Sequence, residues 1–224
     1  HSRRGEILRA VPRDNESVNE CWLSDRDRYS HEGLYSSDRA TQPMLKENGH
    51  WRVAAWDEAL AAAVAVLKSA TVAETGVLVH PASSNEEGFM LSALTKALGI
   101  RNLDHRIKQL DFVDEAMAQV FGTAVANIER AESIILVGCN IRHEMPLLHQ
   151  RIHQAVKRGA KVHVINPVDF DFTFDVVSKT IVPPSGLAGA LSALSATLVA
   201  GSVLILGEIA ENHADASHIR AAAK

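Results

Sequence analysis

Apolar and polar residues follow two different patterns along the chain, and the change falls near residue 50. Residues 1–50 are polar and irregular, with too few apolar positions at regular spacing to build a core alone. From Trp51 onward, apolar runs typical of buried strands alternate with stretches whose apolar residues recur at helical spacing. This order predicts an α/β domain at 51–224, preceded by a small irregular segment that packs on another domain.

The clearest part of the α/β pattern is a helix at 147–158 between two apolar strands at 133–138 and 161–165. Gly159 stands where a C-terminal glycine cap is expected, and two buried strands joined in this way predict a parallel, right-handed crossover. The same signals predict helices at 57–69, 84–99 and 187–199, and strands at 76–80, 180–182 and 203–206. The predicted fold is a doubly wound, mostly parallel, Rossmann-like sheet.

Capping signals mark the ends of two predicted helices. Asp57 is the expected N-cap of the first, and residues 84–87 have the spacing of a capping box that opens the second, which Gly99 closes. At the two ends of the chain, residues 5–11 alternate like the middle of a strand, and residues 217–223 begin a helix without a terminating signal. We therefore expect that both ends are cut from something longer.

Composition narrows the class of protein. With 224 residues, of which 46% are hydrophobic, the chain can bury one sizeable core. The net charge of −4 comes from 23 basic and 27 acidic residues, and neither sign forms a stripe that follows phosphates, so we expect no nucleic-acid partner. Small polar residues interrupt the longest apolar stretch, 187–206, which predicts no membrane-spanning helix. Cys21 and Cys139 lack CxxC spacing and indicate a reducing compartment.

A doubly wound sheet binds ligands at the carboxyl ends of its strands, so a site would lie in the loops at 80–85, 138–146, 166–171 and 207–212. The residues after Gly138 lack the G-x-G-x-x-G pattern, and the sequence has no GxxxxGK[ST] loop and no G-x-S-x-G elbow. Carboxylates outnumber cations in these loops, with Glu86, Glu87, Glu144, Asp169 and Asp171 against Arg142. We predict a cleft that repels polyphosphates.

Two further patterns could bind a metal, and each also has a simpler explanation. His149 and His153 share one face of a predicted helix, but no third ligand stands at motif spacing, so we prefer two partly exposed histidines. Cys139 directly follows a strand, which favours a small buried residue over a reactive thiol. An alternation of acidic and aromatic residues predicts an extended edge rather than a divalent-cation site; its members are Asp169, Phe170, Asp171, Phe172, Phe174 and Asp175.

Seven stretches carry a resemblance to a known family: Arg4–Arg13, Val18–Tyr29, Gly33-Leu34, Pro43-Met44, Ile135–Pro146, Lys161–Asp169 and Phe174-Asp175. Together they resemble the large iron–sulfur subunits of NADH:quinone oxidoreductase, respiratory complex I. The N-terminal stretches are specific to that family. The α/β portion alone resembles the wider molybdopterin-oxidoreductase superfamily.

The resemblance implies a structural domain in the peripheral arm of a proton-translocating respiratory complex, with other subunits of that arm as partners. It implies a location on the cytoplasmic side of the bacterial inner membrane, or the matrix side in mitochondria. Residues 1–50 would be a remnant of the preceding iron–sulfur and β domain with its linker, held to the α/β body by Trp22 and Tyr29. Residues 51–224 would be the Rossmann-like domain, truncated at its C-terminus.

The resemblance also implies which chemistry is missing. In the wider superfamily this domain holds a molybdenum or tungsten pterin, and a cysteine in W-x-C-D-x-x-R-[FY] completes a [4Fe–4S] cluster. Ser24 stands at that cysteine position, Asn166-Pro167-Val168 replaces Asp-Pro-Arg, and Leu110 stands near the expected thiolate metal ligand. We therefore expect no catalytic, cofactor-binding or metal-binding residue here, no small-molecule ligand, and clusters only in N-terminal domains of the intact subunit. The alternative is a stand-alone α/β oxidoreductase with a nucleotide or pterin at the sheet's carboxyl edge.

Overall fold

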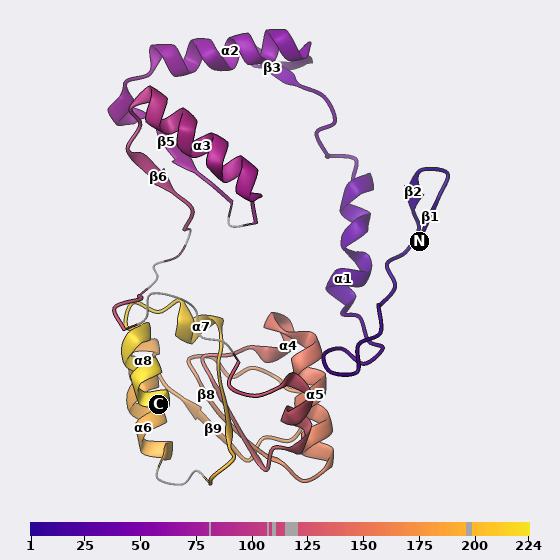
Figure 1. Ribbon diagram of the computed structural model, residues 1–224, viewed down its shortest axis with the longest axis vertical. Helices are drawn as coiled ribbons and strands as arrows, with labels where there is room; N and C mark the ends of the chain where they lie inside the picture. Colours follow the sequence, from indigo (N-terminus) through magenta and orange to yellow (C-terminus); the bar gives the residue numbers. More distant parts are fainter. Residues whose placement is uncertain (81, 107, 109–110, 115–120, 196–198) are drawn as a thin grey trace. The chain divides into compact units, whose positions relative to one another are not determined.

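The computed structural model describes residues 1–80, 82–106, 108, 111–114, 121–195 and 199–224 (Figure 1). The chain forms two compact units. Unit 1 comprises residues 1–31 and 108–224, and unit 2 comprises residues 32–107. Unit 2 is therefore an insertion in the sequence of unit 1.

A four-stranded parallel sheet with the order β10-β7-β8-β9 forms the centre of unit 1. Its strands are β7 (Ser133–Val137), β8 (Lys161–Asn166), β9 (Ser178–Ile181) and β10 (Val203–Leu206). All five residues of β7 are buried, which is typical of a continuous apolar run at the centre of a parallel sheet. The strands coincide closely with the predicted ones, and the α/β class is confirmed.

Helices cover both faces of this sheet (Figure 1). On one face, α5 (Pro146–Lys157) and the 3-10 turn η3 (Val125–Arg130) pack on Ile134, Leu136, Val162 and Val164. On the other face, α6 (Leu187–Ser195) and α8 (Ala216–Ala223) pack on Ile135, Val137 and Ile165. The short elements are α4 (Ile141–Glu144), α7 (Glu208–Glu211) and η4 (Pro184–Gly186). Residues 196–198, at the end of the predicted helix 187–199, lie outside the described residues.

The N-terminal part of unit 1 consists of short elements held by one arginine. These elements are β1 (Ser2–Arg3), β2 (Glu6–Ile7) and α1 (Asp25–Tyr29), while η1 (Ser30–Tyr35) spans the sequence boundary between the units. Arg151 of α5 donates hydrogen bonds to the carbonyl oxygens of Glu16 (2.8 Å) and Val18 (3.1 Å). The expectation that Trp22 and Tyr29 anchor this segment is wrong, since they are 52% and 54% exposed. A polar segment offers carbonyl acceptors, which a buried guanidinium can bind.

Unit 2 contains a hairpin, two longer helices and a pair of parallel strands. Its elements are β3 (Met44–Glu47), β4 (His50–Val53), α2 (Trp56–Ser69), η2 (Val72–Glu74), β5 (Gly76–Leu78), α3 (Asn85–Leu98) and β6 (Asn102–Asp104). The capping box of α3 is confirmed, and Gly99 ends this helix with a φ of 72°. Asp57 is not the N-cap of α2: that position is Ala55, and Asp57 lies in the first turn, where a carboxylate stabilises the helix dipole. The strand at 76–80 is not buried, because it pairs with β6 alone among described residues and Leu78 is 66% exposed.

Candidate functional site

The carboxyl ends of β7 and β10 define the point where a sheet of this kind binds a ligand. The chain runs from β7 to β8 on one side of β7 and later returns to β10 on its other side. Such a reversal leaves a crevice between the loops that follow the two strands. Of the predicted loops, 138–146 and 207–212 meet here, while 80–85 belongs to unit 2.

Two glycines allow these loops to pack backbone against backbone. Gly138 has a φ of +56°, and a Cβ at this residue would lie 2.6 Å from the Ala210 nitrogen. A Cβ at Gly207 would overlap with Cys139. The Gly138 carbonyl accepts a hydrogen bond from the Ile209 amide (3.0 Å). The crevice is therefore closed by main-chain contacts.

The carboxylate of Glu144 lies between the same two loops. It accepts one hydrogen bond from the Asn140 amide (2.6 Å) and another from the Glu208 amide (2.8 Å). Backbone amides at this edge of the sheet bind the phosphates of nucleotides in other α/β proteins. Because a carboxylate of the chain itself accepts from both amides, neither is free to bind a ligand.

Asn166 joins the loop after β7 to the end of β8. Its side chain is fully buried, accepts a hydrogen bond from the Cys139 amide (2.7 Å) and donates one to the Cys139 carbonyl (3.0 Å). The Cys139 side chain is also buried, as predicted. Burial, and then the nearby carboxylate of Glu144, raise the pKa of the Cys139 thiol well above its usual range, and a protonated thiol is a poor nucleophile.

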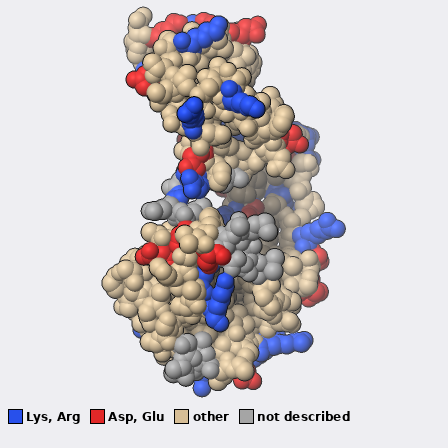
Figure 2. Space-filling view, turned by 60° about the vertical axis from the view of Figure 1, so that its left-hand side comes forward, with Lys and Arg blue, Asp and Glu red and all other residues tan. Residues whose placement is uncertain are grey.

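The surface beside the closed crevice offers more acceptors than donors. A cavity of about 530 Å³ lies there, lined by Arg26, Asn140, His143, Glu144, Glu208 and Ile209. Glu208 forms an ion pair with Lys108. Among the described residues, the Asn140 Oδ1 atom is the buried side-chain oxygen without a hydrogen-bond partner. More widely, Figure 2 shows basic and acidic side chains interspersed on the face that it presents.

Comparisons with known proteins agree with this architecture. The profile of the molybdopterin oxidoreductase family matches residues 39–224. The chain belongs to this family. A second profile, the 4Fe-4S domain of NDSU1/NuoG-like NADH-ubiquinone oxidoreductases, matches residues 1–32 of the same chain.

The relatives of this molybdopterin oxidoreductase domain include respiratory subunits. The G-type subunit of NADH-quinone oxidoreductase from Rickettsia felis is 35% identical over 162 residues, or 71% of this chain and 24% of the relative. The mitochondrial iron-sulfur protein 1 of NADH dehydrogenase [ubiquinone] from Solanum tuberosum is 30% identical over 177 residues, or 78% and 24%. The 78 kDa subunit of NADH-ubiquinone oxidoreductase from Candida albicans is 32% identical over 180 residues, or 77% and 25%. The chain spans about a quarter of the length of these relatives, and the family resemblance is confirmed.

The described residues of this molybdopterin oxidoreductase domain do not fit a pterin nucleotide at the switch point. The two loop amides are bonded to Glu144, and Asn166 is bonded on both sides to Cys139. A phosphate would also meet the unpartnered acceptor of Asn140, and like partial charges repel it. Leu110, at the expected position of a metal ligand, lies outside the described residues.

Ser24 has a structural role at the start of α1. Its Oγ atom accepts a hydrogen bond from the Asp27 amide (3.2 Å) and donates one to the Asp27 carboxylate (2.6 Å). The side chain is 6% exposed. Cys21 is exposed. In the described part of the chain, no three His, Cys, Asp or Glu residues are placed to hold a metal ion.

His149 and His153 contact a phenylalanine rather than a common metal. The ring of His149 lies 5.0 Å from that of Phe174, and the ring of His153 meets the same ring edge-on at 6.5 Å. His149 is only 8% exposed, so the prediction of two partly exposed histidines is wrong for this one. Burial, followed by the charges of His153 and Arg142, lowers its pKa to about 4.

The acidic and aromatic segment 169–175 is not a strand, in contrast to the prediction. The sheet resumes only at β9, so this segment is a loop, and the rings of Phe172 and Phe174 stack at 5.5 Å and pack on the α5 side of the sheet. Asp169 forms an ion pair with Lys179 of β9 (2.5 Å). The burial of two aromatic rings outweighs the strand pattern here.

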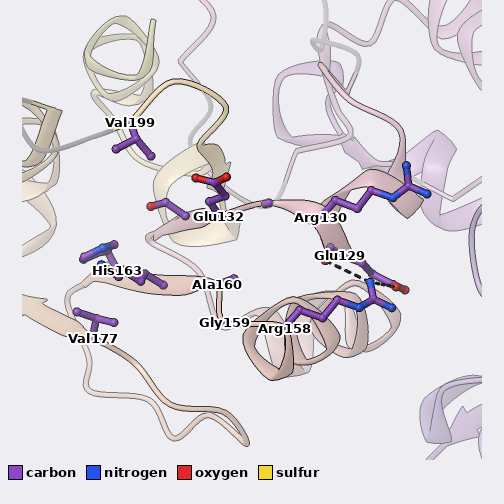
Figure 3. A pocket seen from close by; sticks show the side chains of 12 residues that line it. Glu129, Arg130, Glu132, Arg158, Gly159, Ala160, His163, Val177 and Val199 are labelled. Carbon is purple, nitrogen blue, oxygen red and sulfur yellow. Dashed lines mark hydrogen bonds and ion pairs between the residues drawn. The ribbon is translucent and has the colours of Figure 1, made fainter.

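A second cavity lies at the opposite, amino edge of the sheet (Figure 3). Its volume is about 610 Å³, and residues 129–133 and 158–161 line much of it. In Figure 3 Arg158 reaches toward Glu129, and the two side chains are 2.7 Å apart. His163 bonds through Nδ1 to the Ser178 hydroxyl (2.8 Å). These polar groups satisfy one another, and the edge is not the one at which α/β sheets bind cofactors.

Two buried arginines were missed by the sequence patterns. Arg151 contacts Glu129 (2.5 Å) besides the N-terminal carbonyls. Arg220 of α8 contacts Asp114 (2.6 Å) and Glu211 (2.8 Å). Their partners in residues 16–20 and 111–114 lie more than 100 positions away along the chain, so no local pattern indicates them. No helix in the described part of the chain is long and apolar enough to cross a bilayer.

Proposed function

We propose that this chain is a structural domain of the large iron–sulfur subunit of an NADH:quinone oxidoreductase, with no catalytic centre of its own. The closed switch point carries the proposal, because the Glu144 carboxylate already accepts from both amides that a cofactor phosphate would need. The profile match at 1–32 and the names of the relatives support the identity of the complex.

In this proposal the domain contributes architecture to the peripheral arm, and other subunits of that arm are its partners. The arm lies on the cytoplasmic side of the bacterial inner membrane, or on the matrix side in mitochondria. Residues 1–50 descend from the preceding iron–sulfur and β domain, and residues 51–224 form a doubly wound, Rossmann-like domain. The clusters that carry electrons in the proton-translocating enzyme belong to other parts of the subunit, and this chain alone is inactive.

No catalytic, cofactor-binding or metal-binding residue is proposed for the chain. The competing function, a stand-alone α/β oxidoreductase that binds a nucleotide or pterin, needs free amides and cations at the carboxyl edge. Glu144 and the Glu208–Lys108 ion pair use those groups internally. The comparisons name subunits of a respiratory complex and do not favour this alternative.

Metal analysis and calorimetric titration of the purified chain test the proposal. We expect no stoichiometric iron or molybdenum, and dissociation constants weaker than about 1 mM for NADH, GTP and molybdopterin guanine dinucleotide. A micromolar dissociation constant for any of them would favour the enzyme alternative.

Two variants sharpen the titration. Glu144→Ala removes the carboxylate from both amides, so GTP or inorganic phosphate should bind this variant more tightly than the native chain. Glu132→Ala removes an exposed carboxylate at the opposite edge and should leave the titration unchanged. Equal binding by both variants would show that Glu144 does not occupy the anion position.

The identity of the complex needs a separate measurement. If the proposal holds, purification of NADH:quinone oxidoreductase from the source cells recovers peptides of this chain within the enzyme, in a fixed ratio to the other subunits. Their absence from the purified enzyme would refute the assignment, whatever the titrations give.

A further inference from the structure

The two edges of the sheet in unit 1 have opposite character. β9, at one edge, has the polar sequence Ser178-Lys179-Thr180-Ile181, and its lysine is paired with Asp169. β10, at the other edge, has the apolar sequence Val203-Leu204-Ile205-Leu206. Natural edge strands carry charges that prevent further pairing, whereas interior strands of parallel sheets are continuous apolar runs. β10 therefore has the composition of an interior strand.

The outward backbone groups of β10 can be identified from its pairing with β7. The Gly207 amide donates to the Val137 carbonyl (2.9 Å). Because backbone groups alternate in direction along a strand, the amides of Val203 and Ile205 also face β7, and those of Leu204 and Leu206 face outward. In the described part of the chain, no other strand pairs with this side of β10.

A groove runs along this outward side. Its volume is about 660 Å³, and it is lined by 201–206, by Phe121–Thr123, and by Arg220, Ala223 and Lys224 at the end of α8. Val203, Leu204 and Leu206 are partly exposed, in contrast to the fully buried β7. The groove thus combines half-covered apolar side chains with free strand amides and carbonyls, which are the groups that an added strand binds.

Strand order indicates how such an added strand would run. Counted along the chain, β9, β8, β7 and β10 are the third, second, first and fourth strands of the sheet. A doubly wound sheet with the order 3-2-1-4 continues with a fifth parallel strand outside the fourth. α8 follows β10 and packs beside α6 on one face, as a crossover helix that leads to such a strand would do.

We propose that the groove beside β10 binds a fifth, parallel and mainly apolar strand, supplied by the part of the same subunit that this chain does not span. The inference rests on the proposed function, in which the subunit has the length of relatives that this chain covers to 24%. The strand would pair with the Leu204 and Leu206 amides, and it would convert β10 from an edge into an interior strand.

Hydrogen exchange measured by mass spectrometry tests this proposal on the 224-residue chain and on the whole subunit isolated from its source cells. In the chain alone, the amides of Leu204 and Leu206 should exchange rapidly. In the whole subunit we expect their exchange to slow by at least about 100-fold. On β9, the Val177 amide donates to the Val162 carbonyl, so the Thr180 amide faces outward and should exchange rapidly in both proteins.

Proline substitutions provide a second readout with a matched control. Leu204→Pro and Thr180→Pro each remove one outward amide, and proline is tolerated at a strand edge whose amide faces solvent. We expect Thr180→Pro to shift the melting temperature equally in the two proteins. Leu204→Pro should lower it several degrees further in the whole subunit than in the chain alone.

Equal, rapid exchange at Leu204 and Leu206 in both proteins would overturn the proposal. Slow exchange in the chain alone that becomes rapid on dilution would also overturn it, because a second copy would then occupy the groove. These outcomes leave the proposed function intact. If the source cells contain only a 224-residue protein outside any respiratory complex, the proposed function itself fails.

Discussion

His149 couples one buried side chain to the pH dependence of stability. Its folded-state pKa of about 4 lies below the unfolded value of about 6.5, because burial favours the neutral ring. The stabilisation is fully present above pH 6.5 and is lost as the pH falls toward 4, since unfolding then takes up a proton. We expect a loss on the order of 2 kcal/mol over this range, allowing for solvent screening.

Urea denaturation at pH 7 and pH 4.5 checks this expectation. Carboxylates also titrate in this window, so the comparison with His149→Gln isolates the histidine contribution. The variant should be less stable at pH 7 but should lose less stability on acidification than the native protein. Equal losses in both would contradict the prediction, and His153→Gln serves as the control on the same helix.

Gly138 and Gly201 separate backbone strain from steric closure. Both have positive φ, +56° and +85°, but a Cβ at Gly138 would meet the Ala210 nitrogen at 2.6 Å, whereas the space around Gly201 is open. Gly201→Ala should cost about 1 kcal/mol, the strain of a left-handed alanine. Gly138→Ala should cost at least about 3 kcal/mol, because the backbone must also move. Similar costs in thermal denaturation would mean that the two loops are not tightly packed.

At the scale of elements, prediction succeeded where the local pattern and the final burial agree. The strands β7 and β8 and the helix α5 between them are apolar at the positions that the fold buries, so the sequence alone located them. The segment 169–175 failed this test, because its alternation is satisfied by aromatic stacking on α5 rather than by a strand. The strand at 76–80 was located but not its exposure, which depends on how few strands pair with it.

The candidate site was predictable in location but not in mechanism of closure. Loops 138–146 and 207–212 follow from strand order, and their excess of carboxylates was visible in the sequence. That one of these carboxylates, Glu144, accepts from both loops depends on the close approach of Gly138 and Gly207. Such an approach is set by tertiary packing, and a single glycine after a strand does not indicate it.

Arg151 joins three elements, which makes its removal more costly than its location on one helix suggests. It binds Glu129 of η3 and the carbonyls of Glu16 and Val18, and its side chain is 6% exposed. Arg151→Met would leave the carboxylate of Glu129 buried with one remaining partner, Arg158, and would free the N-terminal segment. We expect a cost of about 3 to 5 kcal/mol in urea denaturation.

Arg158→Met is the matched control for this substitution. Arg158 binds the same carboxylate (2.7 Å), but its side chain is 58% exposed, so its loss should cost no more than about 1 kcal/mol. In addition, trypsin should cut residues 1–31 faster in Arg151→Met than in Arg158→Met. Equal stabilities and equal cleavage rates would show that the N-terminal segment is held by other contacts.

At the scale of the whole molecule, the two units differ in how much they bury. Among the described residues of unit 2, only Ala54 and Thr95 are buried, whereas unit 1 contains both apolar clusters around the parallel sheet. Large apolar side chains of unit 2 are exposed, among them Trp51 (62%), Trp56 (69%) and Phe89 (76%). Local stability follows buried apolar contacts, so unit 2 should open before unit 1.

Pulse proteolysis with thermolysin along a urea series measures this order of opening. Fragments cut within residues 32–107 should appear at a urea concentration at least about 1 M lower than fragments cut within 121–195, because unit 2 has less apolar burial to hold it folded. The N-terminal residues 1–31 should follow unit 1, since Arg151 binds them to α5. Cleavage of all three regions at one urea concentration would mean that the units unfold as one cooperative body, and that contacts beyond the buried clusters hold unit 2 folded.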